Sequence, residues 1–287
     1  MINKKIIYTS LLVLFVFCLI LGGVILNFQD SPLKVSFFDV GQGDSILISD
    51  GSYQILIDGG PNGEAVLEKL GRSLPFWDRR IEVVIATHPD ADHLSGLVDV
   101  LERYKVNLVI DSGMESDSQV YKKFEEVIRE KGIRKELGRE GEKIRIGEAV
   151  LEIMSPESGF AGGKVKDTNR ESIVSKLAFG ENTFLLMADA PIEKENKLLS
   201  KYPDLKARIL KAGHHGSKYS SGEEFLEKVK PEEVILSVGK NNRYGHPASE
   251  TLERLGKSGA MILRTDEIGN IVYVCQETGT PCQRESF

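Results

Sequence analysis

Cysteine, tryptophan and histidine are scarce in this sequence, which holds three, one and five of them among its 287 residues. Cys18 lies in an apolar run near the N-terminus, so only Cys275 and Cys282 are close together in the chain. We expect these two to pair in an oxidising compartment, with two free thiols as the alternative. They do not predict a zinc site, because no further cysteine or histidine lies nearby in the sequence.

Positive charge is also in short supply. Lysine and arginine number 37 against 43 aspartates and glutamates, which gives a formal net charge of -6. Residues 1–31 hold two lysines and one aspartate, so the rest of the chain carries -7. This sign disfavours tight nonspecific binding of nucleic acid. A local basic rim at a site remains compatible with it, because a site can concentrate charge that the average hides.

One segment lacks charge altogether. The run from Leu11 to Phe28 has no charged residue, and Lys4 and Lys5 precede it. Because ~20 apolar residues cross the hydrocarbon core of a bilayer, we expect residues 1–31 to be a membrane anchor with one transmembrane helix. A cleaved signal segment is the alternative. The lysines favour an inside N-terminus, so we expect a membrane-anchored chain whose main domain is extracytoplasmic or, after cleavage, secreted.

Residues 32–287 contain neither an internal repeat nor a proline-rich linker, so we expect a single domain. Short β-branched and aromatic runs alternate with amphipathic segments. The expected strands are 35–39, 45–49, 53–57, 81–86, 108–110, 149–154, 172–179, 183–187, 206–210, 234–238, 261–264 and 271–275, and the expected helices are 63–70, 94–104, 118–131, 191–200, 222–230 and 248–256. Two runs of strands, each finished with helices, predict an α+β fold with two packed sheets between outer helices, an αββα four-layer sandwich.

Each of the five histidines lies at the end of an expected strand or in the turn after it. They are His88, His93, His214, His215 and His246. None falls in the middle of a helix on an apolar face, where a purely structural histidine would be the better interpretation. Histidines without a common role would scatter, so this clustering predicts a shared site.

The segment His88-Pro89-Asp90-Ala91-Asp92-His93 directly follows an apolar strand. Imidazole nitrogen and carboxylate oxygen are suitable ligands for zinc or manganese. A tight turn after a strand can direct such side chains at one cation, or at two cations ~3.5–4 Å apart. The alternative is that Asp92 caps the following helix, which explains one residue but not the two histidines and Asp90.

Two further elements complete the expected centre. His214 and His215 follow the strand 206–210 in the segment Gly213–Ser217, and Asp189 follows the strand 183–187. An acid at the end of a buried strand needs a partner, and a metal ion would provide one. Taken alone, Asp189 is equally well interpreted as a helix N-cap.

The six-residue segment resembles the metal-binding motif of the metallo-β-lactamase superfamily. It is similar to the branch found as the C-terminal domain of bacterial DNA-uptake competence channels of the ComEC type, which has an aspartate at the place of Asp90. Further blocks match the same branch, namely Phe38-Asp39-Val40-Gly41-Gln42-Gly43-Asp44-Ser45, Ile57-Asp58-Gly59-Gly60, Lys211 to Ser217 and Tyr244-Gly245-His246-Pro247. The resemblance extends from Val35 to about Arg254 and implies a metallo-β-lactamase-like hydrolase domain over residues 32–287.

The resemblance also implies a set of ligands for two divalent metal ions. His88 and Asp90 would bind one metal ion, Asp92 and His93 the other, and Asp189 would bridge them. Of the pair His214 and His215, we assign His214 to the second metal ion and His215 to catalysis, and the sequence leaves open which of them is the ligand. Asp58 would support the motif without binding metal.

The sequence departs from the general superfamily pattern at Asn169, where many members have a histidine. Asn169 would be a weak ligand or a substrate contact, and an oxygen-rich ligand set leaves the metal open between zinc and manganese.

We expect a metal-dependent hydrolase acting on phosphodiester bonds, with nucleic acid, single-stranded DNA included, or an envelope phosphodiester as substrate. Asp92 would accept a proton after attack, and His246 would protonate the leaving group or orient substrate with Lys218 or Arg243. The alternative for His246 is a turn residue before Pro247. Hydrolysis of an ester, lactone or β-lactam, and a non-catalytic surface binding module, are the alternative functions. The sequence predicts no protein partner.

Overall fold

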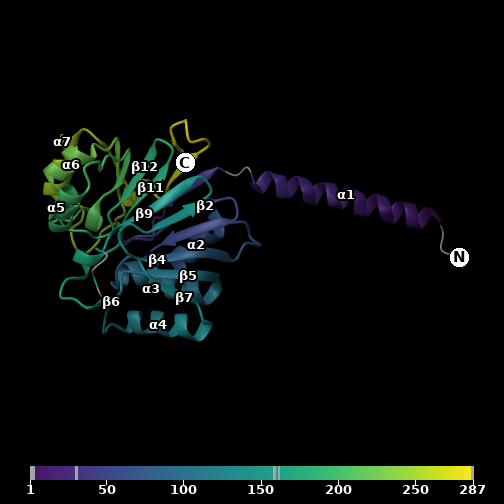
Figure 1. Ribbon diagram of the computed structural model, residues 1–287, viewed down its shortest axis with the longest axis horizontal. Helices are drawn as coiled ribbons and strands as arrows, with labels where there is room; N and C mark the ends of the chain where they lie inside the picture. Colours follow the sequence, from purple (N-terminus) through teal and green to yellow (C-terminus); the bar gives the residue numbers. More distant parts are fainter. Residues whose placement is uncertain (1–3, 30–31, 158–159, 161, 286–287) are drawn as a thin grey trace.

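The computed structural model describes residues 4–29, 32–157, 160 and 162–285, and it places two sheets face to face between two layers of helices (Figure 1). The first sheet has the order β17-β16-β1-β2-β3-β4-β5-β7. Its strands are β1 (Leu33–Phe37), β2 (Ile46–Asp50), β3 (Tyr53–Ile57), β4 (Arg80–Ala86), β5 (Lys105–Asp111), β7 (Arg134–Leu137), β16 (Ile271–Cys275) and β17 (Gln283–Arg284). β1, β2 and β3 form an antiparallel meander, and β3, β4, β5 and β7 run parallel.

The second sheet has the order β15-β14-β13-β12-β11-β9-β8. Its strands are β8 (Lys143–Ile146), β9 (Ala149–Ser155), β11 (Val174–Phe179), β12 (Asn182–Leu186), β13 (Ile209–Lys211), β14 (Glu233–Leu236) and β15 (Met261–Arg264). The strands from β12 to β15 run parallel, so their carboxyl ends meet at one edge. A short ribbon of β6 (Met114–Glu115) and β10 (Gly163–Lys164) lies beside the sandwich.

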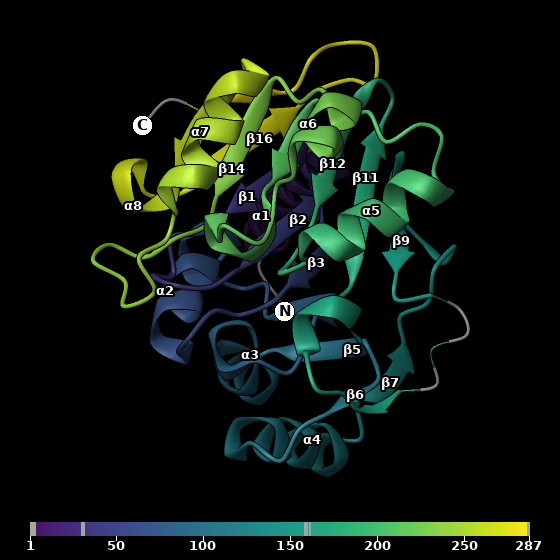
Figure 2. The same cartoon turned by 90° about the vertical axis from the view of Figure 1, so that its left-hand side faces the viewer.

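Three apolar clusters separate the four layers. The central cluster joins the inner faces of both sheets and includes Phe37, Leu151 and Tyr273. A second cluster lies under α2 (Gly63–Ser73), α3 (Ala91–Arg103) and α4 (Gln119–Lys131). A third lies under α5 (Ile192–Lys201), α6 (Glu223–Val229) and α7 (Ser249–Ser258), close to the short helix α8 (Thr265–Ile268) (Figure 2). The predicted α+β sandwich of two sheets between outer helices is therefore confirmed.

Helix α1 (Lys4–Gln29) extends away from the sandwich (Figure 1). The structure contradicts the predicted transmembrane helix. Crossing ~30 Å of hydrocarbon requires a sustained apolar stretch of ~20 residues, and no helix within the described part of the chain is both long and apolar enough.

The predicted disulfide is present. Cys275 at the end of β16 is bonded to Cys282 in the loop before β17. Asn182 and Arg208 of the second sheet hold the same loop, because Asn182 accepts the backbone N–H of Cys282 at 2.7 Å and Arg208 donates to its carbonyl at 3.0 Å. The C-terminal segment is thus tied to both sheets.

Candidate metal centre

The predicted site residues come from loops at one edge of the sandwich. His88 and Asp90 follow β4, Asp189 follows β12, and His214 and His215 lie in the 3-10 turn η2 (Gly213–Gly216) after β13. These strands end at the same edge because they run parallel to their neighbours within each sheet. β1 runs parallel to β3, which lies two strands away in the same sheet, so β1 begins at the opposite edge of the sandwich.

Helix α3 begins earlier than predicted, at Ala91 instead of residue 94, so Asp92 and His93 lie in its first turn. Asp90 occupies the N-cap position, but its side chain makes no capping hydrogen bond. Its carboxylate instead accepts a hydrogen bond from the Thr168 hydroxyl at 2.8 Å. Capping by Asp92 is therefore excluded, because Asp92 lies inside the helix with its carboxylate 3.5 Å from Nε2 of His215.

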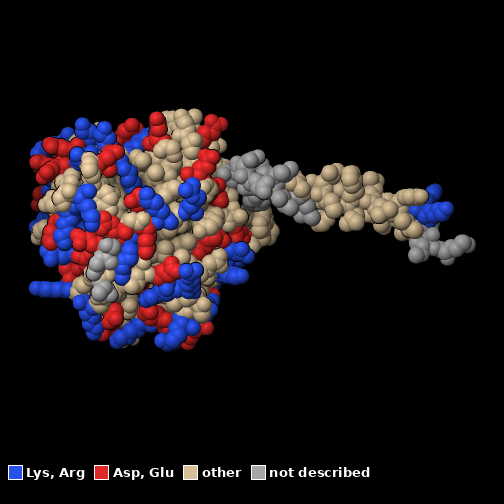
Figure 3. Space-filling model, in the orientation of Figure 1, with Lys and Arg blue, Asp and Glu red and all other residues tan. Residues whose placement is uncertain are grey.

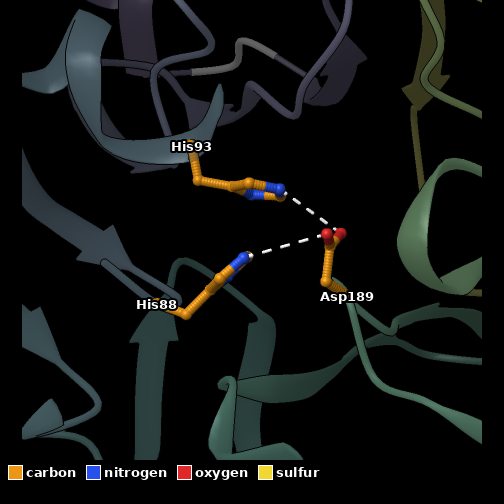
Figure 4. A group of neighbouring side chains, drawn as sticks. All are labelled: His88, His93 and Asp189. Carbon is orange, nitrogen blue, oxygen red and sulfur yellow. Dashed lines mark ion pairs between the residues drawn. The ribbon is translucent and has the colours of Figure 1, made fainter. Parts of the chain in front are cut away.

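Asp189 stands at the centre of the cluster (Figure 4). Its Oδ2 lies 3.8 Å from Nε2 of His88, and its Oδ1 lies 3.3 Å from Nε2 of His93. Nε2 of His215 is 3.4 Å from the same Oδ1. Loops of both sheets thus direct ring nitrogens at one buried carboxylate.

Groups behind the three histidines fix which ring nitrogen faces the centre. Nδ1 of His93 bonds Asp58 at 2.7 Å, and Nδ1 of His215 bonds the Ser237 carbonyl at 2.8 Å. Thr87 gives its only hydroxyl proton to Asp58 and lies 2.9 Å from Nδ1 of His88, which must therefore donate to it. This network assigns the proton of every ring to Nδ1 and leaves every Nε2 as an acceptor aimed at the centre.

The centre fits a bound cation. Nε2 of His93 and Nε2 of His215 are 3.3 Å apart, so either one of them carries a proton or both face a cation. Among the described residues, the buried atoms Nε2 of His88 and Oδ1 of Asp189 have no hydrogen-bond partner. The combinations His88–His93–Asp189 and Asp92–His93–His215 each place their ligand atoms within 4.8 Å of one another. Buried imidazole nitrogen and carboxylate oxygen atoms that lack a hydrogen-bond partner are what a cation site requires.

The electrostatics of the cluster favour positive charge at the same place. Burial opposes a charged ring, yet Asp189 and Asp44 outweigh it and raise the pKa of His215 to about 9. Asp189 and Asp58 likewise raise the pKa of His93 well above its usual value. Burial and the neighbouring His93 lower the pKa of His88 to about 4, so that ring is neutral. A cation would satisfy the carboxylates without protonating the rings.

A buried ion pair between Lys211 and Asp44 supports the centre. The ammonium group of Lys211, at the end of β13, contacts Asp44, and both side chains are buried. Burial alone would raise the pKa of Asp44, but Lys211 and His215 hold it well below its usual value. Oδ1 of Asp44 lies 3.4 Å from Nδ1 of His215, so the pair also orients that ring.

The remaining predicted residues lie at the periphery. Nε2 of His214 is 3.7 Å from Asp189, and its Nδ1 is 3.4 Å from the Asn169 amide in the turn η1 (Thr168–Glu171). The rings of His214 and His246 have centroids 5.6 Å apart. His246 is half-buried and contributes to none of the candidate metal groups found among the described residues.

Sequence reasoning missed Thr87, Lys211 and the role of Asp44. Asp44 lies inside the matched block Phe38–Ser45, and a buried acid in a glycine-rich turn was the available signal. Lys211 is a lysine at the end of an apolar strand, which is costly without a partner and could have pointed to one. No pattern in the sequence distinguishes Thr87 from other threonines.

Comparison with known proteins agrees with this geometry. Residues 38–113 match the model of the metallo-beta-lactamase superfamily. ComE operon protein 3 of Bacillus subtilis (strain 168) is 34% identical in an alignment of 258 residues that covers 84% of this chain and 33% of that protein. Competence protein ComA of Neisseria gonorrhoeae is 26% identical over 261 residues, 89% of this chain and 34% of that protein. The chain spans about a third of the length of these curated relatives.

Solved structures show the same fold. The metallo-beta-lactamase fold protein YhfI from Bacillus subtilis superimposes with a TM-score of 0.58 and 13% identity, covering 85% of this chain and 100% of that one. Igni18, a metallo hydrolase from Ignicoccus hospitalis, gives a TM-score of 0.51 at 14% identity over 88% of this chain and 99% of that one. At these identities the likeness concerns the fold alone.

The match over residues 38–113 and the relatives along most of the chain identify it as a member of the metallo-β-lactamase superfamily. Within it, the chain is a relative of the ComEC-type competence proteins over most of its length, as the sequence motifs predict.

Proposed function

We propose that this chain hydrolyses phosphodiester bonds, with nucleic acid as the favoured substrate. The observation that carries the proposal is the centre around Asp189, where three Nε2 atoms and the Asp92 carboxylate converge. The names of two relatives, Competence protein ComA and Recombination protein 2, refer to competence and recombination, which favours a DNA-related substrate. Positive and negative side chains are intermixed over the face seen in Figure 3.

The residues divide into those that hold metal and those that act on substrate. His88, His93 and Asp189 would hold one divalent cation, and Asp92 and His215 would share in a second. Bound there, such cations would supply Lewis acidity that activates water and polarises a phosphoryl oxygen. Because His215 and not His214 belongs to these groups, we now propose His215 as the ligand and His214 as a substrate-facing residue.

Asp92 and His246 are the residues predicted to transfer protons. Although burial raises its pKa, contacts with His215 and His93 lower the pKa of Asp92 to about 2, so it is ionised near pH 7 and is better suited to hold a cation than to accept a proton. Burial and the neighbouring His214 lower the pKa of His246, so it is neutral near pH 7 and would orient substrate more readily than protonate a leaving group. Oxygen ligands favour manganese and imidazoles favour zinc, so we propose either metal.

A panel of substrates tests the function. The purified chain is loaded with zinc or manganese, its bound metal is measured, and it is assayed on single-stranded DNA, bis-(p-nitrophenyl) phosphate and a chromogenic β-lactam. We expect bound metal and cleavage of the two phosphodiesters. Cleavage of the β-lactam alone would support the alternative function, and metal binding without any hydrolysis would support a binding module.

The variant Asp92→Ala is expected to lose phosphodiester cleavage by more than about a hundredfold, because even partners of metal ligands contribute about 10–100-fold. Asp99→Ala is the matched control. Asp99 lies in the same helix, is also partly exposed and belongs to none of the candidate metal groups. Full activity of Asp92→Ala, or an equal loss in both variants, would refute the role given to Asp92.

We also propose that the chain acts outside the cytoplasm, because a disulfide such as Cys275–Cys282 persists in oxidising compartments. Thiol labelling of the freshly isolated chain tests this. Two thiols should become reactive only after reduction, and their labelling without reduction would contradict the proposal.

A further inference from the structure

A cleft of about 580 Å³ opens beside the candidate metal centre. Asp90 and Asp92 line its inner end, and the loop after β14 forms a wall with Asn242, Arg243 and Tyr244. Gln42 lies on the lining as well. The volume falls within the ~300–1,000 Å³ of small-molecule sites, so the cleft can accept a group of nucleoside size.

The aromatic ring of Tyr244 is half exposed at this cleft, with 51% of its surface accessible. The ring lies nearly parallel to that of His246, with centroids 5.9 Å apart and an interplanar angle of 18°. His246 in turn neighbours His214, whose Nε2 is 3.7 Å from Asp189. A row of three rings therefore leads from the cleft to the metal centre.

The loop that carries Tyr244 is held in place by Asn242. Its side-chain oxygen accepts the backbone N–H groups of Tyr244 and His246 at 3.1 and 3.0 Å. Its amide group donates to the His246 carbonyl at 2.6 Å and to the Gly239 carbonyl at 3.0 Å. Tyr244 is thus a preorganised surface aromatic, which lowers the entropy cost of binding a ligand.

Arg243 provides positive charge over the ring of Tyr244, near its hydroxyl end. Its guanidinium carbon lies 4.9 Å from the ring centroid of Tyr244, and its Nη2 donates to the Tyr244 hydroxyl at 2.8 Å. An exposed aromatic beside a cation is the combination that binds single-stranded nucleic acid, because bases stack on the ring and phosphates contact the cation. A duplex cannot use it, since its bases already stack on one another.

We propose that Tyr244 is a stacking platform for a base of single-stranded DNA and that Arg243 contacts an adjacent phosphate, which places the next phosphodiester at the metal centre. This proposal rests on the proposed function and names its substrate class.

Two labelled oligonucleotides of equal length and charge test the proposal, one of thymidines and one with abasic sites at its central positions. Both strands carry phosphorothioate linkages to prevent turnover, and their dissociation constants are measured by fluorescence anisotropy on the metal-loaded full chain. We expect the wild type to bind the thymidine strand about tenfold more tightly than the abasic strand, the effect of about one stacked base. Tyr244→Ala should abolish this difference, and Tyr244→Phe should preserve it.

Tyr219→Ala is the matched control. Tyr219 is 65% exposed and has the Lys218 ammonium 5.2 Å from its ring centroid, but it does not line the cleft. It should leave the preference for thymidine unchanged. Equal binding of both strands by the wild type, binding of neither, or an equal loss in Tyr219→Ala and Tyr244→Ala would overturn the proposal.

Hydrolysis of bis-(p-nitrophenyl) phosphate by the metal-loaded chain separates this proposal from the proposed function. Hydrolysis without a preference for thymidine would reject the platform alone. A preference for thymidine without any phosphodiester cleavage would reject the enzyme and leave a binding module.

Discussion

Asp58 lies directly behind the two histidines of the main motif and forms a candidate metal group with Asp44 and His93. It adopts a left-handed backbone conformation with φ 57°, and its carboxylate accepts hydrogen bonds from Thr87 at 2.6 Å and from His93 at 2.7 Å. Through Thr87 it also fixes the ring of His88. One carboxylate therefore sets the orientation of both histidines of the main motif.

Asp58→Asn keeps the shape of this side chain and removes its charge and one acceptor. We expect metal affinity to fall about 10–100-fold, as for other partners of metal-binding histidines. Competition with a chromogenic chelator measures the affinity. Asp39→Asn is the control, because Asp39 also accepts a nearby backbone N–H, from Gly41 at 3.2 Å, without touching these histidines. Unchanged affinity in Asp58→Asn would contradict the argument.

The site residues were predictable where their spacing along the sequence is distinctive. The segment from His88 to His93 could be identified because several ligand types lie within one turn after a strand. The choice between His214 and His215 could not be made, since both are adjacent and only the turn η2, with φ 48° and 53° at these residues, decides which ring points inward.

At the scale of elements, α3 lies unusually close to the turn after β3. A Cβ atom added to Gly96 would come within 1.9 Å of the Gly59 carbonyl oxygen, and the Gly96 amide donates to the Gly60 carbonyl at 3.0 Å. The same turn carries Asp58, and the same helix carries Asp92 and His93. Close packing of these two elements therefore sets the metal-site geometry.

Gly96→Ala should separate the elements, lower the free energy of unfolding by about 1–3 kcal/mol through overpacking and weaken metal binding. Gly71→Ala in α2 is the control, because nothing lies within 4 Å of its added Cβ. That change should stabilise the protein by about 0.5–1 kcal/mol, as expected for a helical glycine. Urea unfolding of both variants measures these changes in the free energy of unfolding. If the two changes had the same sign, the interpretation would be wrong.

Helix α5 contributes a buried acid that holds the loop after η2. The Glu195 carboxylate accepts the backbone N–H groups of Ser221 and Gly222 at 2.6 and 2.8 Å. Burial raises the pKa of Glu195 from 4.5 to about 7. Between those pH values the unfolded chain is ionised while the folded chain keeps the proton, so stability falls as pH rises through this window and levels off above it.

We expect the free energy of unfolding to lose about 3 kcal/mol from this group between pH 4.5 and 7, since one pKa unit corresponds to about 1.4 kcal/mol. Glu195→Gln removes the titration. The stability of the wild type relative to Glu195→Gln, taken from urea unfolding, should therefore be greatest at pH 5 and smallest at pH 8. A difference independent of pH would show that Glu195 does not titrate there.

Most of the longer elements were predictable from hydrophobic periodicity, and two of the strands that were missed share one cause. β3, β15 and β16 have the bounds that the sequence predicts. The missed strands β7 and β8 read Arg-Lys-Glu-Leu and Lys-Ile-Arg-Ile, and each forms the edge of its sheet. Charged side chains at edge strands prevent pairing between molecules, and the same charges hide the strand pattern from sequence analysis.

At the scale of the whole molecule, the disulfide between Cys275 and Cys282 closes the C-terminal segment against both sheets. Its loop is short, so it stabilises the fold by about 2–3 kcal/mol. Reduction should lower the thermal midpoint by roughly 3–5 °C for a chain of this size. Calorimetry with and without reductant measures this shift. The double variant Cys275→Ser, Cys282→Ser should be insensitive to reductant, and a wild type that is equally insensitive would contradict the prediction.

The sandwich itself was predictable from two runs of strands. The contact between the segments that follow strands of the two different sheets was not. Asp189 and His93 are distant in the sequence and approach within 3.3 Å only because the two sheets pack through Phe37, Leu151 and Tyr273. Such long-range packing leaves no local pattern in the sequence.

The centre draws His88, His93 and Asp92 from one half of the chain and Asp189 and His215 from the other, so neither half holds all five of these residues. Both proposed cation positions can be completed only when the two halves have folded and packed together. A misfolded or truncated chain would lack part of this ligand set, so the centre that we propose for hydrolysis would form only in the assembled domain.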